Sequence, residues 1–302
     1  MRTEDGLAVH GAVISASTFL RWDPGENFGQ GKYATATEKT DENGMAIVSM
    51  ASLEGEIAYG VLDLPNFYHD RPRHFQFTKA ALGRWGPWNP TLEIVLKKKS
   101  DPVPLYARKI EVWQGVIADA LLTTNSVGFD LLKGDWLPPY GKGEVADFIF
   151  SLKQKLGDMT PDRIQIFDSE FVVGFSNKTD GIQSAYADPQ GGSILRLPRM
   201  APQDGYIPYL VRHISQNGRG RQGDLPRADQ NYFFRVRTKR DDTGKIVSAL
   251  YGKIHGEFEW GLRGQLGFTY YLNPTPDEHN LEFDPKRNLF KKLKSLEQVH
   301  DP

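Results

Sequence analysis

Aromatic, histidine and arginine side chains are concentrated between residues 68 and 88. The members selected as candidate ligand-binding residues are Tyr68, His69, His74, Trp85 and Trp88. Exposed tyrosine and tryptophan rings combine a large apolar area with a polar edge, so they can stack on a sugar ring or anchor a protein partner. The alternative is that the tryptophans fill the open end of a β-sandwich, which the usual burial of large aromatic side chains favours.

A second basic segment, residues 215–224, carries Arg219 and Arg221 among glycines. Two guanidinium groups could hold a carboxylate or a sulfate, and glycine leaves backbone N–H groups free to converge on an anion. The glycine spacing matches neither the dinucleotide-binding nor the P-loop pattern. An ordinary surface loop is the favoured alternative. Both arginines are kept as ligand-binding candidates.

Residues that usually mark catalysis or metal binding are absent or scattered. The chain has no cysteine, which excludes thiolate zinc sites, iron–sulfur clusters and cysteine nucleophiles. The seven histidines show no metal-binding spacing, and no G-x-S-x-G motif occurs. Two acidic pairs, Asp168 with Glu170 and Glu257 with Glu259, would each share a strand face as glycosidase carboxylates can, but 38 acidic residues make such pairs expected by chance. The sequence therefore assigns no catalytic residue, metal ligand or cofactor.

The composition indicates a folded protein of about two domains. Hydrophobic residues make up 39% and charged residues 25% of the 302 positions. A net charge of −1 argues against a nucleic-acid partner. The longest uncharged stretch, 6–20, is too short for a transmembrane helix. We expect an extracellular or periplasmic protein whose leader has been removed. A cytosolic protein would show the same features, so that alternative and the oligomeric state stay open.

Short apolar segments between glycines and prolines predict a mostly β protein. In the N-terminal third, strands are expected at 7–14, 32–37, 45–50, 56–62 and 91–97, with a hairpin turn at 40–44. The segment 97–104, with three lysines and two prolines, predicts a connector between domains 1–99 and 105–302.

The second domain is expected to be a larger antiparallel β domain. Its predicted strands are 163–175, 206–214, 231–238, 245–254 and 265–272. Residues 147–156 fit a helix or a strand, and the β-prone run Phe148-Ile149-Phe150 favours a strand. Asp284 as N-cap, Pro285 at the first helical position and apolar residues at helical spacing predict a short C-terminal helix.

The N-terminal pattern resembles a carboxypeptidase-regulatory-like or transthyretin-like β-sandwich. The residues that carry the resemblance are Asp5-Gly6-Leu7-Ala8-Val9-His10-Gly11-Ala12-Val13 and Thr40-Asp41-Glu42-Asn43-Gly44. The resemblance covers about residues 5–97 and implies a spacer, docking or binding role rather than one activity. Residues 105–302 are similar to stretches of uncharacterised bacterial proteins, which implies no activity.

Together these features favour a secreted or envelope-associated bacterial binding module. A glycan is the favoured partner and a surface protein the next, without nucleic acid or a membrane span. The alternatives are a glycan-active hydrolase or lyase on the second domain, and a structural surface or assembly protein.

Overall fold

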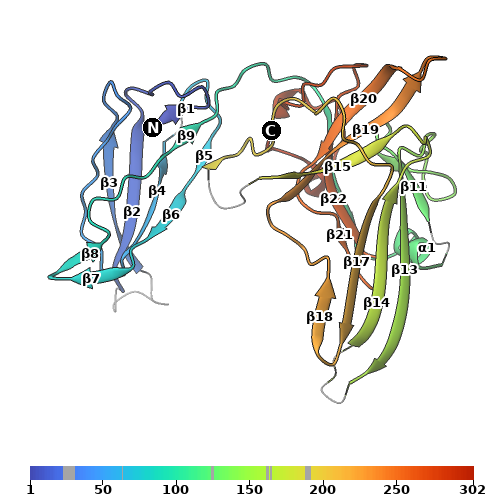
Figure 1. Cartoon of the computed structure of the whole chain (residues 1–302), viewed down its shortest axis with the longest axis horizontal. Helices are drawn as coiled ribbons and strands as arrows, with labels where there is room; N and C mark the ends of the chain where they lie inside the picture. The colour runs from blue at the N-terminus through green and yellow to red at the C-terminus, as the bar shows by residue number, and fades with distance from the viewer. Residues whose placement is uncertain (23–30, 63, 124–125, 161–162, 164, 188–191) are drawn as a thin grey trace. The chain divides into compact units, whose positions relative to one another are not determined.

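The computed structural model describes residues 1–22, 31–62, 64–123, 126–160, 163, 165–187 and 192–302. These residues form a mostly β structure of several sheets, as the sequence predicts. They divide into two compact units (Figure 1). Unit 1 comprises Met1–Ser100 and residues 192–196, and unit 2 comprises Asp101–Ala187 and Leu197–Pro302. The boundary after Ser100 lies within the predicted connector, but the sequence boundaries did not include the return of 192–196 to unit 1.

Unit 1 is built on a four-stranded antiparallel sheet in the order β3-β2-β4-β6. The strands are β2 (Val13–Trp22), β3 (Gly31–Lys39), β4 (Glu56–Val61) and β6 (Arg73–Gln76). Three short pairs accompany them: β1 (Arg2–Thr3) with β9 (Val95–Leu96), β5 (Asp70–Arg71) with β16 (Gly192–Ser193), and β7 (Lys79–Ala81) with β8 (Arg84–Gly86). The buried cluster is small and consists of Ala12, Ile14, Val61, Ile94 and Leu96.

The predicted strand at 45–50 is wrong, although the turn before it forms. The amides of Asn43 and Met45 donate to Asp41 Oδ1 at 2.9 and 2.8 Å. The chain then continues without regular structure. The side chain of Ile47 is 86% exposed, because no sheet of the described part of the chain covers it. The strand at 91–97 shortens to Val95–Leu96. The transthyretin-like relationship stays a prediction.

Unit 2 contains two six-stranded sheets. The first sheet has the order β10-β22-β20-β19-β15, with β21 paired to β22; its strands are β10 (Tyr106–Val112), β15 (Gly181–Tyr186), β19 (Gln230–Arg240), β20 (Ile246–Ile254), β21 (Glu259–Trp260) and β22 (Leu266–Leu272). The second sheet has the order β12-β11-β13-β14-β17-β18; its strands are β11 (Val127–Asp130), β12 (Asp135–Trp136), β13 (Phe148–Met159), β14 (Gln165–Gly174), β17 (Leu210–Asn217) and β18 (Gly220–Gly223).

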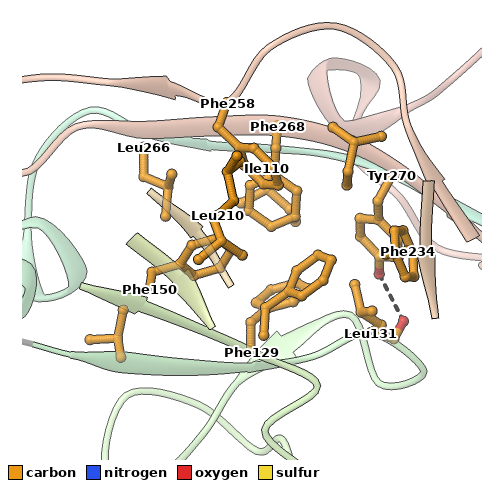
Figure 2. Packing of buried hydrophobic residues seen from close by; sticks show 14 of the residues in the cluster. Ile110, Phe129, Leu131, Phe150, Leu210, Phe234, Phe258, Leu266, Phe268 and Tyr270 are labelled. Atoms are coloured by element: carbon orange, nitrogen blue, oxygen red, sulfur yellow. Dashed lines mark hydrogen bonds between the residues drawn. The ribbon is translucent and has the colours of Figure 1, made fainter. Parts of the chain in front are cut away.

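The two sheets of unit 2 pack through an aromatic core (Figure 2). Phe148 of the second sheet lies 5.0 Å, ring to ring, from Phe234 of the first, and Phe150 lies 5.2 Å from Phe268. The Tyr270 hydroxyl donates to a main-chain carbonyl, that of Leu131, at 2.9 Å, so its polar atom is satisfied inside the core. Successive side chains of a strand point to opposite faces of its sheet. Every second side chain therefore projects into this core, and the side chains between them project from the outer faces.

The outer face of the first sheet is partly covered by the end of the chain. Tyr251 and Tyr271 pack there with Leu281, Phe283 and Val299 in a second buried cluster. The hydroxyl of Tyr271 donates to the main-chain oxygen of Asp301 at 2.9 Å. The C-terminal segment therefore covers one end of this face.

Helical content differs from the prediction at two places. The segment 147–156 is strand, as favoured, but Val116–Thr123 forms an α-helix (α1) that the sequence analysis did not identify. The C-terminal helix is present only as two 3-10 turns, Pro285–Arg287 and Ser295–Glu297. None of the helices in the described part of the chain is long and apolar enough to cross a membrane.

The C-terminal helix stops early because the side chain of Asn288 ties the chain to β10. Asp284 caps the first turn as predicted, accepting the Lys286 N–H at 3.0 Å. The next residue after the turn, Asn288, then exchanges hydrogen bonds with the backbone of Ala107 in β10, at 3.3 and 2.8 Å. These bonds hold the chain in an extended form beside β10, which local helical spacing does not reveal.

Candidate functional site

A groove of about 170 Å³ opens on unit 2 where β10, β21 and β22 lie side by side. One water needs only about 10–15 Å³ of such space, so the groove can hold a larger ligand. Its nine lining residues come from three neighbouring stretches of the first sheet: Glu111, Val112, Trp113, Glu259, Trp260, Gly261, Gln265, Leu266 and Gly267. We call this feature the Trp113 groove.

Two glutamates stand in one cross-strand row of the Trp113 groove. Glu111 of β10 is paired with Gly267 of β22, and Glu259 of β21 is paired with the same glycine from the other side. Residues that are directly opposite in an antiparallel sheet project from the same face. The row therefore presents two carboxylates with a gap between them where Gly267 has no side chain.

The adjacent row shows which face this is. Leu266 is buried in the aromatic core, and Trp260 stacks on Phe171 of the second sheet at 5.6 Å. Because successive side chains alternate, Glu259 and Gly267 project from the opposite, outer face. The groove thus lies on the same outer face as Tyr271, four residues along β22 from the part that the C-terminal segment covers.

Glycines keep the floor of the groove open. A Cβ atom added to Gly267 would lie 3.3 Å from Glu259 Oε2, and one added to Gly261 would lie 2.5 Å from Gln265 Oε1. The Glu259 carboxylate therefore lies over the Gly267 backbone rather than extending away from the sheet. Alanine at either position would reduce the free space.

Trp113 supplies the apolar wall. Its side chain follows β10 two residues after Glu111 and is 63% exposed. Glu111 Oε1 lies 2.5 Å from the ammonium nitrogen of Lys109, which stands on the same side of the strand. Glu259 makes no ion pair with any residue that the structure describes. The groove combines an aromatic ring, one neutralised carboxylate and one carboxylate with uncompensated charge.

The sequence-predicted residues near the start of the aromatic segment are Tyr68, His69 and His74. Tyr68 is buried beside a cavity of about 10 Å³, and His69 is exposed. His74 is exposed, and its Nδ1 lies 2.8 Å from Glu56 Oε1. The cavity beside Tyr68 has space for about one water.

The two candidate tryptophans of unit 1 have different surroundings. Trp85 is half-buried, donates from Nε1 to the Ser52 carbonyl at 2.8 Å, and packs its ring against Gly55. Trp88 is 54% exposed, with the Arg84 guanidinium 5.0 Å from its ring centre. Trp85 therefore stabilises unit 1, while Trp88 keeps a surface that a partner could contact.

The two arginine candidates belong to unit 2, not to the unit that carries the aromatic segment. Arg219 lies in the turn between β17 and β18 and is exposed. Arg221 donates from Nε to Gln216 Oε1 at 3.3 Å and lies over the Phe167 ring at 5.7 Å. The seven predicted residues therefore do not form one site within either unit.

A buried cluster of charged side chains in unit 2 is paired within the fold. Asp130 and Asp147 are each 1% exposed and both contact Arg237. Burial pushes the pKa of Asp130 upward, but three backbone N–H donors and the charge of Arg237 outweigh it, so that pKa lies below its ordinary value. Burial dominates at Asp147 and raises its pKa despite the same arginine. We assign this cluster to stability.

Sequence reasoning missed the Trp113 groove. Glu259 was considered only as a partner of Glu257, but Glu257 is held by Arg212 at 2.5 Å and by the Tyr232 hydroxyl at 2.8 Å. The available signal was the run Glu259-Trp260-Gly261 shortly before the predicted strand 265–272. That signal becomes specific only when the register is known.

Among the described residues, no group of three or more histidine, aspartate or glutamate side chains is placed to hold a metal ion. No protein-family model, curated protein or solved structure matches the chain.

Proposed function

We propose that the protein is a carbohydrate-binding protein and that the Trp113 groove is its binding site. The observation that carries the proposal is the exposed Trp113 ring beside the Glu111–Gly267–Glu259 row. Small-ligand sites are typically concave and mostly apolar, with a few polar groups that fix orientation. This groove has that composition.

The chemistry of a sugar fits these groups. One face of a pyranose ring presents C–H bonds, which pack on an aromatic ring such as Trp113. Its hydroxyls donate hydrogen bonds, and carboxylates such as Glu111 and Glu259 accept them. The glycine floor allows a ring to approach the backbone closely.

The wider setting belongs to the same proposal. A secreted or envelope-associated bacterial protein, extracellular or periplasmic, would meet glycans, and a transthyretin-like unit 1 would act as a spacer or docking module. The role of unit 1 rests on the N-terminal sequence pattern at 5–13 and 40–44. A surface protein that contacts Trp88 is the alternative partner, and a structural assembly role is the alternative without a soluble ligand.

A comparison of two tryptophan variants tests the proposal. Retention on immobilised polysaccharides and isothermal titration with soluble oligosaccharides are measured for the wild type, Trp113→Ala and Trp88→Ala. We expect Trp113→Ala to weaken glycan binding about tenfold or more, since burying an aromatic ring contributes well over 1.4 kcal/mol. Trp88→Ala, a similarly exposed tryptophan on unit 1, should bind as the wild type does. The opposite pattern, or no retention of wild type on any glycan, would reject the proposal.

A glycan hydrolase is the second candidate, because two carboxylates flank the floor. Glu111 and Glu259 are separated by one strand, so their Cα atoms are about 9–10 Å apart. Paired carboxylates on either side of a glycosidic bond are the usual machinery of glycoside hydrolysis. Release of reducing ends that is lost in both Glu111→Gln and Glu259→Gln would favour the hydrolase over the binding protein.

A further inference from the structure

We infer that the Trp113 groove selects glycans that carry a free, protonated amino group. The inference rests on the proposed function and specifies its ligand class. The selectivity follows from the charges of the groove. These charges are an observation separate from the aromatic wall.

The charge in the groove is not balanced. Lys109 neutralises Glu111 through a 2.5 Å contact, and the Glu111 side chain is only 24% exposed. Glu259 is exposed and has no cationic partner among the described residues. Arg263 lies in the turn between β21 and β22 but is not one of the lining residues. The groove therefore has one net negative charge.

The free carboxylate has a defined position. Glu259 Oε2 lies over the Gly267 backbone, close enough that a Cβ there would be 3.3 Å away. Gly267 is directly opposite Glu111, and Trp113 follows Glu111 by two residues, roughly 7 Å along the strand. A sugar ring packed on Trp113 would extend over the glycine floor toward Glu259.

This arrangement favours an ammonium group over other substituents. A protonated amine on such a ring would form a charge-assisted hydrogen bond to Glu259, stronger than the bond from a hydroxyl. It would also gain from a cation–π contact with the indole. A uronate or sulfate would be repelled by the same carboxylate, and an N-acetyl group would lose the charge.

Three matched oligosaccharides test the inference, namely β-1,4-linked oligomers of glucosamine, N-acetylglucosamine and glucose of equal length. Titration calorimetry is performed at pH 6, where the free amine is protonated, with wild type, Glu259→Gln and the control Glu170→Gln on the outer face of the second sheet. We expect wild type and Glu170→Gln to prefer the glucosamine oligomer by about tenfold. Glu259→Gln should lose that preference and bind the glucosamine and glucose oligomers with equal affinity.

The outcomes separate the inference from the proposed function. Equal binding of all three oligomers by wild type would overturn amine selectivity and leave carbohydrate binding in place. An equal proportional loss for all three in Glu259→Gln, with the preference for the glucosamine oligomer retained, would also overturn it, because the carboxylate would then act only as a hydroxyl acceptor. No binding of any oligomer by wild type, with unchanged tryptophan fluorescence, would reject both.

Discussion

Arg237 donates from Nε and Nη2 to the two carboxylate oxygens of Asp147, each at 2.9 Å. The arginine has a φ of 54°, in the left-handed region, and lies where the pairing of β19 with β20 shifts register. The backbone amides of Arg237 and Thr238 donate to Oδ2 and Oδ1 of Asp180, each at 2.9 Å. The carboxylates thus hold a backbone conformation that a non-glycine residue rarely adopts.

We predict that Arg237→Lys destabilises unit 2 by about 3 kcal/mol, because a single ammonium cannot replace the bidentate pairing and leaves buried carboxylates under-paired. Urea denaturation followed by fluorescence measures the change. Arg219→Lys, at an exposed turn, is the control and should stay within about 0.5 kcal/mol of wild type. Equal stability of the two variants would contradict the assignment.

The low pKa of Asp130 predicts a pH-dependent effect of Asp130→Asn. A carboxyl whose pKa is lowered by folding contributes stability above its ordinary value of 3.8, and that contribution is lost as the pH falls through the lower folded value. The stability difference between wild type and Asp130→Asn should therefore be largest at pH 5–7 and shrink below pH 4. Asp147, whose pKa is raised, changes the stability with pH in the opposite direction, and it is present in both proteins. Denaturation at several pH values checks this, and a difference that grows on acidification would refute it.

Trp85→Ala should cost unit 1 about 2–3 kcal/mol, somewhat below the range for a fully buried tryptophan, since its ring covers Gly55 and its Nε1 donates to Ser52. Trp88→Ala should change stability by less than about 0.5 kcal/mol, because the ring is 54% exposed. Thermal unfolding of each variant is the measurement. A large loss in Trp88→Ala would show that this tryptophan is a packing residue as well.

Gly267→Ala should abolish glycan binding while leaving the fold intact. The added methyl would contact the Glu259 carboxylate at 3.3 Å and fill the floor, whereas alanine suits strand backbone better than glycine does. Gly174→Ala is the matched control in β14, where the nearest atom to the new Cβ is 3.9 Å away. Binding by Gly267→Ala at wild-type affinity would place the ligand elsewhere.

Local turn chemistry and the longer strands were predictable from the sequence. The turn expected after β19 forms because Asp241 Oδ1 accepts the amides of Thr243 and Lys245, interactions that involve only neighbouring residues. The expected strand 231–238 corresponds to Gln230–Arg240, whose consecutive residues Tyr232, Phe233 and Phe234 are buried on both faces of the sheet. Such features depend on short stretches of chain, and a single sequence contains them.

The Trp113 groove and the strand ends were not predictable in this way. Glu111 and Glu259 become neighbours only through the pairing of three strands, and a shift of one residue would turn either side chain to the core. The segment 45–50 shows the converse case, because an alternating pattern formed no strand where no buried face was available. Both outcomes depend on residues distant in sequence.

The strand β16 has a consequence for how the protein is made. Leu195, fully buried, and the Gly192–Ser193 strand belong to unit 1, although they follow nearly half of unit 2 in the chain. During synthesis, the first hundred residues leave the ribosome without this part of their own structure. Unit 1 is completed only after residue 196 has emerged, while most of the first sheet of unit 2 is still untranslated. A gene fragment that ends at residue 100 would therefore encode an incomplete unit, with the edge at β5 unpaired.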